Sequence, residues 1–73
     1  MMKDKINQLI ADTLGIEVEC IQEETYISDV PEWDSMMFVM ILSELEEQLN
    51  ISIPIEKAME MNKVSDFYEY IEE

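Results

Sequence analysis

Residues that interrupt regular backbone structure are rare in this chain of 73 residues. It contains one glycine, Gly15, and two prolines, Pro31 and Pro54. These three positions divide the chain into four apolar segments, and because so little stops a helix within them, helices are the expected secondary structure. The chain is also short enough to form only one domain, residues 1–73. We therefore expect a single domain of the all-α class.

The first helix is predicted over residues 2–14. Its apolar residues recur at the three- and four-residue spacing of an amphipathic helix: Ile6, Leu9, Ile10 and Leu14. Gly15 follows where a C-terminal cap is expected.

A long first loop is predicted between Gly15 and Asp34, because no helical period is sustained there. Its apolar residues are spaced as on an extended segment: Ile16, Val18, Ile21, Tyr26, Ile27 and Val30.

The second helix is predicted from Ser35 to Leu49 or Asn50. Asp34 is a good N-terminal cap for it, and Asn50 can close it. The core-facing stripe consists of Phe38, Ile41, Leu42, Leu45 and Leu49.

Two further helices are predicted after Pro54. The first is a short turn from Ile55 to Met61, and the second runs from about Val64 to Glu72, with Asn62 or Ser65 as its cap. Three main helices, a short one and a long first loop predict a small antiparallel four-helix bundle.

Acidic residues dominate the charge. Eighteen Asp and Glu, four lysines and no arginine give a formal net charge of −14. Such a charge repels nucleic acid and anionic lipid and attracts basic protein surfaces. We therefore expect no nucleic-acid binding. We also expect no membrane insertion, because no apolar run approaches the length of a membrane span.

The chain has no histidine and a single cysteine, Cys20. It therefore lacks a Cys/His zinc site and a Ser/His or Cys/His catalytic pair, and Cys20 cannot form an internal disulfide. Residues 1–5 lead into an amphipathic pattern and not into the uninterrupted apolar core of a signal peptide. These features favour the reducing cytoplasm and predict no metal site.

The predicted second helix has more apolar surface than one bundle core can cover. Besides its core stripe it carries Met36, Met37, Val39 and Met40 near its start. Methionine is flexible and polarisable, and it is common on surfaces that accept several partners. Two interpretations stay open: these side chains widen the core contact, or they form an exposed docking face.

Ser35 follows Asp34 at the start of the same helix. Unpaired backbone amides and the helix dipole favour an anion such as a phosphate at that place. A serine there is well placed to carry a phosphodiester. The alternative is that Asp34 and Ser35 are only a capping pair.

These residues resemble the acyl carrier proteins and the related peptidyl carrier proteins. Asp34-Ser35-Met36 is similar to the family's Asp-Ser-Leu attachment motif, and Trp33 precedes it as in many carriers. Further similarities continue along nearly the whole chain without an evident gap: Leu14-Gly15-Ile16, Leu45-Glu46-Glu47, Ile53-Pro54, Val64 and Tyr70-Ile71. The resemblance implies one carrier domain over residues 1–73, with a four-helix fold of the acyl-carrier-protein type.

The resemblance also implies a function. Ser35, with Asp34 beside it, would receive 4′-phosphopantetheine from coenzyme A, and the thiol of that arm would hold an acyl or aminoacyl group as a thioester. Cys20 would not be the cargo thiol, and the protein itself would catalyse nothing. The implied partners of this freestanding monomer are a phosphopantetheinyl transferase, an acyl- or aminoacyl-loading ligase or adenylating enzyme, and a downstream synthase or transferase.

The sequence departs from the family shortly after the serine. Fatty-acid-type carriers usually place acidic residues two and five positions after it, where this chain has Met37 and Met40. Apolar residues there are more similar to peptidyl carriers, and they favour a dedicated pathway, for a polyketide, a nonribosomal peptide or an envelope component, over fatty-acid biosynthesis. The partner-docking residues expected on this basis are Met36, Met37, Val39, Met40, Glu44, Glu47 and Glu56.

Two other classes of function compete with the carrier interpretation. An acidic helical adaptor that binds a basic protein would need the negative charge but not Ser35. A calcium-binding module has less support, because no segment shows the alternating Asp and Asn ligands, the central glycine and the terminal glutamate of an EF-hand loop.

Overall fold

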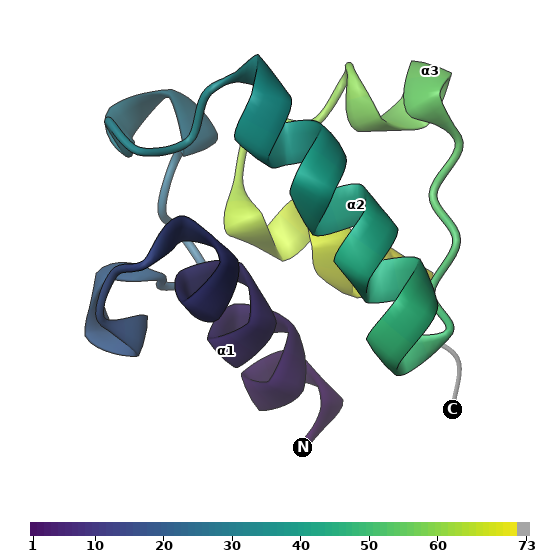
Figure 1. Cartoon of the computed structure of the whole chain (residues 1–73), viewed down its shortest axis with the longest axis horizontal. Helices are drawn as coiled ribbons and strands as arrows, with labels where there is room; N and C mark the ends of the chain where they lie inside the picture. Colours follow the sequence, from purple (N-terminus) through teal and green to yellow (C-terminus); the bar gives the residue numbers. More distant parts are fainter. Residues whose placement is uncertain (72–73) are drawn as a thin grey trace.

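The computed structural model describes residues 1–71, and every regular element in that range is a helix (Figure 1). This confirms the predicted all-α class: the described range holds three longer helices, one short helix and two 3-10 turns of three residues each. The α-helices are α1 (Met2–Leu14), α2 (Ser35–Leu49) and α3 (Ile55–Ala58), and the 3-10 helices are η1 (Val18–Cys20), η2 (Ile27–Asp29) and η3 (Val64–Tyr70). No helix of the described range is both long and apolar enough to cross a membrane.

Helices α1 and α2 begin and end where the sequence predicts, because local caps stop them. Gly15 ends α1 in the left-handed conformation, with φ 72°, and its N–H donates to the carbonyls of Ala11 and Asp12. Asn50 ends α2 in the same conformation, with φ 58°. Glycine adopts this conformation without strain and asparagine tolerates it better than most residues, so both predicted caps are confirmed.

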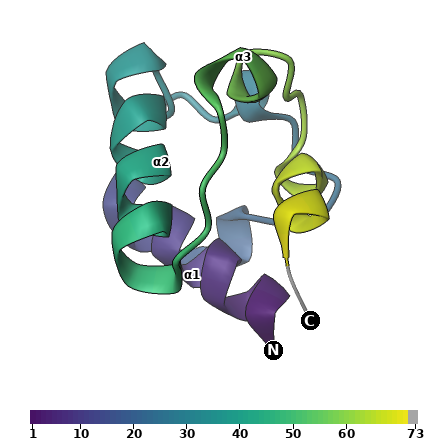
Figure 2. The same cartoon turned by 90° about the vertical axis from the view of Figure 1, so that its right-hand side faces the viewer.

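The hydrophobic core lies where α1, α2 and η3 meet. Figure 2 shows α2 and η3 on opposite sides of the molecule, with α1 running across the base between them. The buried apolar side chains of this core are Ile6, Leu9, Ile10, Ala11, Leu14, Ile21, Val30, Trp33, Ile41, Leu45, Ile51, Val64 and Phe67. Only Ile41 and Leu45 come from α2, while Phe38, Leu42 and Leu49 of its predicted stripe are partly buried against the core. One long side of α2 is therefore left free.

The first loop is more structured than the prediction of an extended segment. It contains the two 3-10 turns η1 and η2, each too short to give a periodic apolar pattern. Of the apolar residues in this loop, Ile21 and Val30 are buried, whereas Tyr26 is about half exposed.

Backbone hydrogen bonds fasten this loop to the segment before η3. The Ile27 N–H donates to the Asn62 carbonyl at 2.8 Å, and the Val64 N–H donates to the Thr25 carbonyl at 3.0 Å. Tyr26 and Lys63 form an isolated antiparallel bridge between them. The loop that leads into α2 and the chain that follows α3 are thus held together.

The last two helices differ from the prediction in length and in capping. Helix α3 ends at Ala58 and not at Met61, and the predicted end of the last helix at Glu72 lies outside the described residues. The predicted cap of the last helix, Asn62 or Ser65, is wrong. Lys63 occupies the cap position of η3, and the carboxylate of Asp66 accepts hydrogen bonds from the N–H groups of Asn62 at 2.8 Å and Lys63 at 3.1 Å.

Replacing Asp66 with alanine should lower the free energy of unfolding by about 1 kcal/mol at neutral pH, the usual cost of a lost cap. The hydrogen bonds from Asn62 and Lys63 lower the pKa of Asp66 below 3.8 in the folded chain. Its contribution is therefore complete above that value and is lost as the pH falls through the folded pKa.

Urea unfolding of the wild type and Asp66→Ala across the acid range tests this dependence. The difference in stability should shrink as the pH falls below about 4. Glu69→Ala removes an exposed carboxylate from the same helix and serves as the charge control. A difference that stays constant down to low pH would contradict the assignment of the cap to the Asp66 carboxylate.

Candidate functional site

Ser35 is the first residue of α2, and its side chain is exposed. Asp34 precedes it in an extended conformation, and the Asp34 carboxylate accepts a hydrogen bond from the Met37 N–H at 2.9 Å. The capping role predicted for Asp34 is confirmed. It starts the helix at Ser35, whose side chain is exposed.

The first turn of α2 keeps free donors beside Ser35. The Met37 N–H is held by the Asp34 carboxylate, and the Phe38 N–H by the Asp34 carbonyl at 2.9 Å. Within residues 1–71 the N–H groups of Ser35 and Met36 have no hydrogen-bond partner. These donors and the positive end of the helix dipole fit a phosphate ester on the Ser35 hydroxyl.

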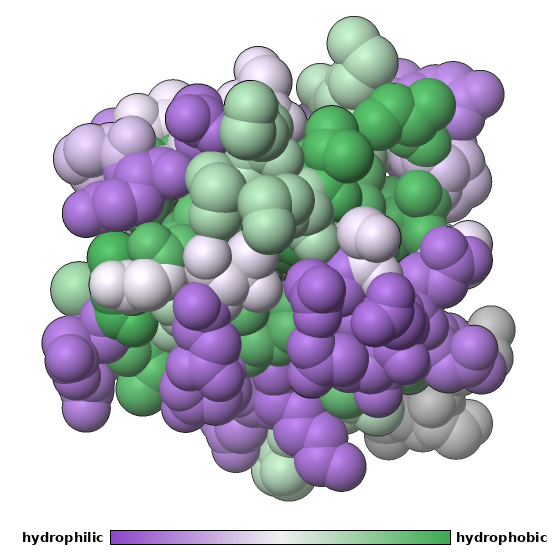
Figure 3. Space-filling model, in the orientation of Figure 1, coloured by the Kyte–Doolittle hydropathy of each residue, from purple (hydrophilic) through white to green (hydrophobic). Residues whose placement is uncertain are grey.

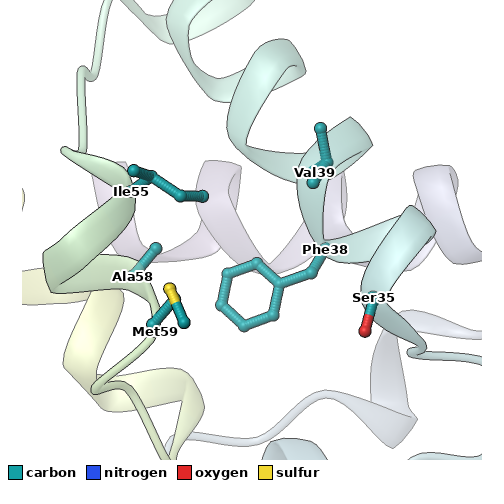
Figure 4. Close-up of a pocket in the computed structure, with 6 residues that line it drawn as sticks. All are labelled: Ser35, Phe38, Val39, Ile55, Ala58 and Met59. Carbon is teal, nitrogen blue, oxygen red and sulfur yellow. The ribbon is translucent and has the colours of Figure 1, made fainter.

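An apolar groove of about 270 Å³ begins at Ser35 and lies between α2 and α3 (Figure 4). Helix α2 contributes one wall and α3 with the residue after it contributes the other. The lining residues are Ser35, Phe38, Val39, Ile55, Ala58 and Met59. Apart from the serine all of them are apolar, so a flexible chain attached to Ser35 would have an apolar surface directly beside it.

The surface next to Ser35 is also apolar. In Figure 3 hydrophobic residues gather over the first half of α2 and over α3, and hydrophilic residues cover the second half of α2. We call this surface the apolar face; its large exposed side chains are 47% to 81% accessible, and they are Met36, Val39, Met40, Ile55 and Met59. Of the two interpretations of the surplus apolar residues on α2, exposure therefore holds for Met36, Val39 and Met40.

Met37 differs from the other methionines predicted for docking. Its side chain is partly buried and packs against the hydrophobic core. Met37 therefore widens the contact with the core and is not part of the exposed surface.

The acidic residues predicted for docking lie on α2 and α3. Glu44 and Glu47 follow Met36 and Met40 along one side of α2, at the four- and three-residue spacing that keeps side chains on the same helix face. Glu56 is exposed on α3, beside Ile55. Along α2 the structure thus places apolar side chains near Ser35 and carboxylates beyond them.

Two further aromatic rings lie against the Phe38 ring that lines the groove. The ring of Phe38 is 5.7 Å from that of Trp33 and 5.9 Å from that of Phe67, and the last two rings are 5.8 Å apart. Trp33 and Phe67 are buried, whereas Phe38 is partly exposed. Phe38 therefore belongs both to the groove and to the edge of the core.

Sequence reasoning missed the contribution of α3 to this site. Ile55 and Met59 were given no role, although their four-residue spacing places them on one face of a helical turn. Phe38 was expected only in the core. Cys20 lies in η1 with an exposed free thiol, and it does not line the groove.

Comparison with known proteins adds independent findings. The family model for the phosphopantetheine attachment site matches residues 4–71. Acyl carrier proteins from three strains of Clostridium perfringens (SM101, ATCC 13124 and 13) are each 41% identical to this chain over 73 residues. The alignment covers 99% of this chain and 95% of each relative.

Replacing Asp34 with alanine should lower the free energy of unfolding by about 1 kcal/mol, because the Met37 N–H loses its acceptor. Asp34→Asn keeps an acceptor oxygen and should stay within a few tenths of a kcal/mol of the wild type. Chemical denaturation followed by circular dichroism measures both variants. Equal stability of the alanine and asparagine variants would mean that this hydrogen bond does not hold the start of α2.

Proposed function

The chain belongs to the family of carrier proteins with a phosphopantetheine attachment site, and we propose that Ser35 is the residue that carries the arm. Members of this family are carriers and not catalysts, and the cofactor is a covalently attached 4′-phosphopantetheine. The chain is thus an acyl carrier protein by family.

The observation that carries the assignment to Ser35 is its position. It is an exposed hydroxyl at a capped helix start, with two free backbone N–H groups beside it and an apolar groove beginning at its side chain. When attached, 4′-phosphopantetheine supplies a thiol that holds an acyl group as a thioester. The chain supplies the attachment oxygen, backbone donors for the phosphate and apolar walls for the flexible part.

We propose that partner enzymes dock on the apolar face and on the carboxylates beyond it. Met36, Val39 and Met40 would be desolvated next to Ser35, while Glu44, Glu47 and Glu56 attract basic side chains of the partner. Apolar contacts supply most of the binding energy of such interfaces, and charge complementarity raises the rate of encounter. The partners would be a phosphopantetheinyl transferase, a loading ligase or adenylating enzyme, and a downstream synthase or transferase.

We also propose a dedicated biosynthetic pathway and a cytoplasmic location. The apolar Met37 and Met40, where fatty-acid-type carriers usually have acidic residues, support the dedicated pathway. The exposed free thiol of Cys20 supports a reducing compartment, because unpaired exposed thiols are uncommon where disulfides form readily.

Intact mass spectrometry tests the attachment. The chain is incubated with coenzyme A and a broad-specificity phosphopantetheinyl transferase, beside the variants Ser35→Ala and Ser43→Ala. Ser43 is an exposed serine on the same helix and serves as the matched control. We expect the wild type and Ser43→Ala to gain one phosphopantetheine and Ser35→Ala to gain none.

A gain of mass in Ser35→Ala would overturn the assignment to that residue. No gain in any variant, with a transferase that modifies another carrier in the same tube, would favour the acidic adaptor that needs no serine.

Replacing Met40 with glutamate tests the docking face. A carboxylate in the centre of an apolar contact should lower kcat/KM for loading roughly tenfold, equivalent to about 1.4 kcal/mol, without unfolding the domain, because Met40 is about half exposed. Gln48→Glu adds the same charge at the far end of α2 and should have a much smaller effect. An equal loss of kcat/KM in the two variants would point to net charge and not to the apolar face.

A further inference from the structure

We propose that the ring of Phe38 closes the groove off from the interior and so limits the length of the acyl chain that can lie in it. This inference rests on the proposed attachment at Ser35. It assigns to Phe38 the role of a length-determining residue.

The position of Phe38 supports this role. Figure 4 shows its ring pointing from α2 toward α3, in the middle of the groove between Ser35 and Met59. The ring also stacks in tilted contact with Trp33 and Phe67, with centroids 5.7 Å and 5.9 Å away. Phe38 thus forms the floor of the groove, and the two buried rings lie next to it on the core side.

The three rings leave no continuation of the groove into the core. Trp33 and Phe67 are themselves in contact, with centroids 5.8 Å apart, and Phe67 is fully buried. Interiors packed in this way hold few voids larger than a water molecule. An aliphatic chain that lies in the groove therefore meets the ring of Phe38 and remains between α2 and α3.

The size and chemistry of the groove indicate its occupant. The groove of about 270 Å³ is slightly smaller than the pockets of ~300–1,000 Å³ that hold drug-sized ligands, so it has room for a short or medium-length aliphatic group. Val39, Ile55 and Met59 offer no hydrogen bond to a polar cargo, and burying an unpaired polar group is unfavourable. The occupant that fits is a short or medium-length aliphatic acyl group on the chain's own arm, because Ser35 lies at the rim and tethering keeps the local concentration high.

The single tryptophan of the chain provides a direct readout. The wild type, Phe38→Ala and Ile55→Ala are loaded by a transferase from the coenzyme A thioesters of octanoic and hexadecanoic acid, each with a bromine at the end of the chain. Bromine quenches indole fluorescence on contact, so the emission of Trp33 reports whether the chain end reaches the rings. Ile55→Ala is the matched control, because it trims a wall of the groove and leaves the floor in place.

We expect weak quenching in the wild type and in Ile55→Ala with either chain. In Phe38→Ala the hexadecanoyl chain should quench Trp33 strongly, because it can pass the missing ring and reach the core. Each additional methylene that it buries there favours the buried position of the chain over the exposed one by about fourfold. Strong quenching in the wild type would overturn the proposal. So would an absence of quenching in loaded Phe38→Ala.

Intact mass on the same samples separates this inference from the proposed function. A sample with the acyl arm attached tests Phe38, whereas a failure to load any variant overturns the attachment at Ser35 and the inference with it. If Phe38→Ala does not fold by circular dichroism, Phe38→Leu takes its place. Leucine removes the aromatic floor and keeps an apolar side chain. The loaded leucine variant should quench Trp33 more than the wild type does, but less than expected for a groove with no side chain at its floor.

Discussion

The hydrogen bond from the Met37 N–H to the Asp34 carboxylate determines where α2 begins, and the candidate site depends on that start. The cap holds the first turn, so that Ser35 and the free N–H groups of Ser35 and Met36 lie at the exposed start of the helix. Ile41 and Leu45, which are buried farther along, hold the rotation of the helix and so keep Phe38 in the groove. The cap and the buried side of α2 together place the exposed serine beside the groove.

The free side of α2 explains why so apolar a helix is compatible with so acidic a chain. Two of its side chains are fully buried, and the exposed methionines and Val39 lie near Ser35. A net charge of −14 opposes self-association through this surface, because two copies would repel each other. The same charge attracts a basic partner. The exposed apolar surface can therefore bind basic partners while it repels copies of the chain itself.

Local signals made much of this fold predictable from the sequence. Gly15, Asp34 and Asn50 set the ends of α1 and α2 through interactions within a few residues. The excess of apolar residues on one helix gave the exposure of Met36 and Met40 as one of two interpretations, and the structure decides for it.

The features that the sequence did not predict depend on contacts between distant segments or on very short turns. The bridge between Tyr26 and Lys63 joins residues far apart in the chain and leaves no periodic pattern, and the wall of the groove formed by Ile55 and Met59 exists only because α3 lies beside α2. The sequence predicts Asn62 or Ser65 as the cap of η3 because the side chain of Lys63 cannot cap a helix start, whereas the structure shows that Asp66 reaches back from inside the helix. The 3-10 turns η1 and η2 are shorter than any window in which periodicity can be read.

The two walls of the groove are held in unequal ways. Helix α2 is anchored along its length by core side chains, while α3 has one buried residue, Ala58. The segment that contains α3 is instead fixed at its two ends, by the Ile51 N–H bound to the Leu45 carbonyl and by the Asn62 contacts to Asp66 and Ile27. The core therefore holds α3 less firmly than α2, and a change in the width of the groove would displace α3 more than α2.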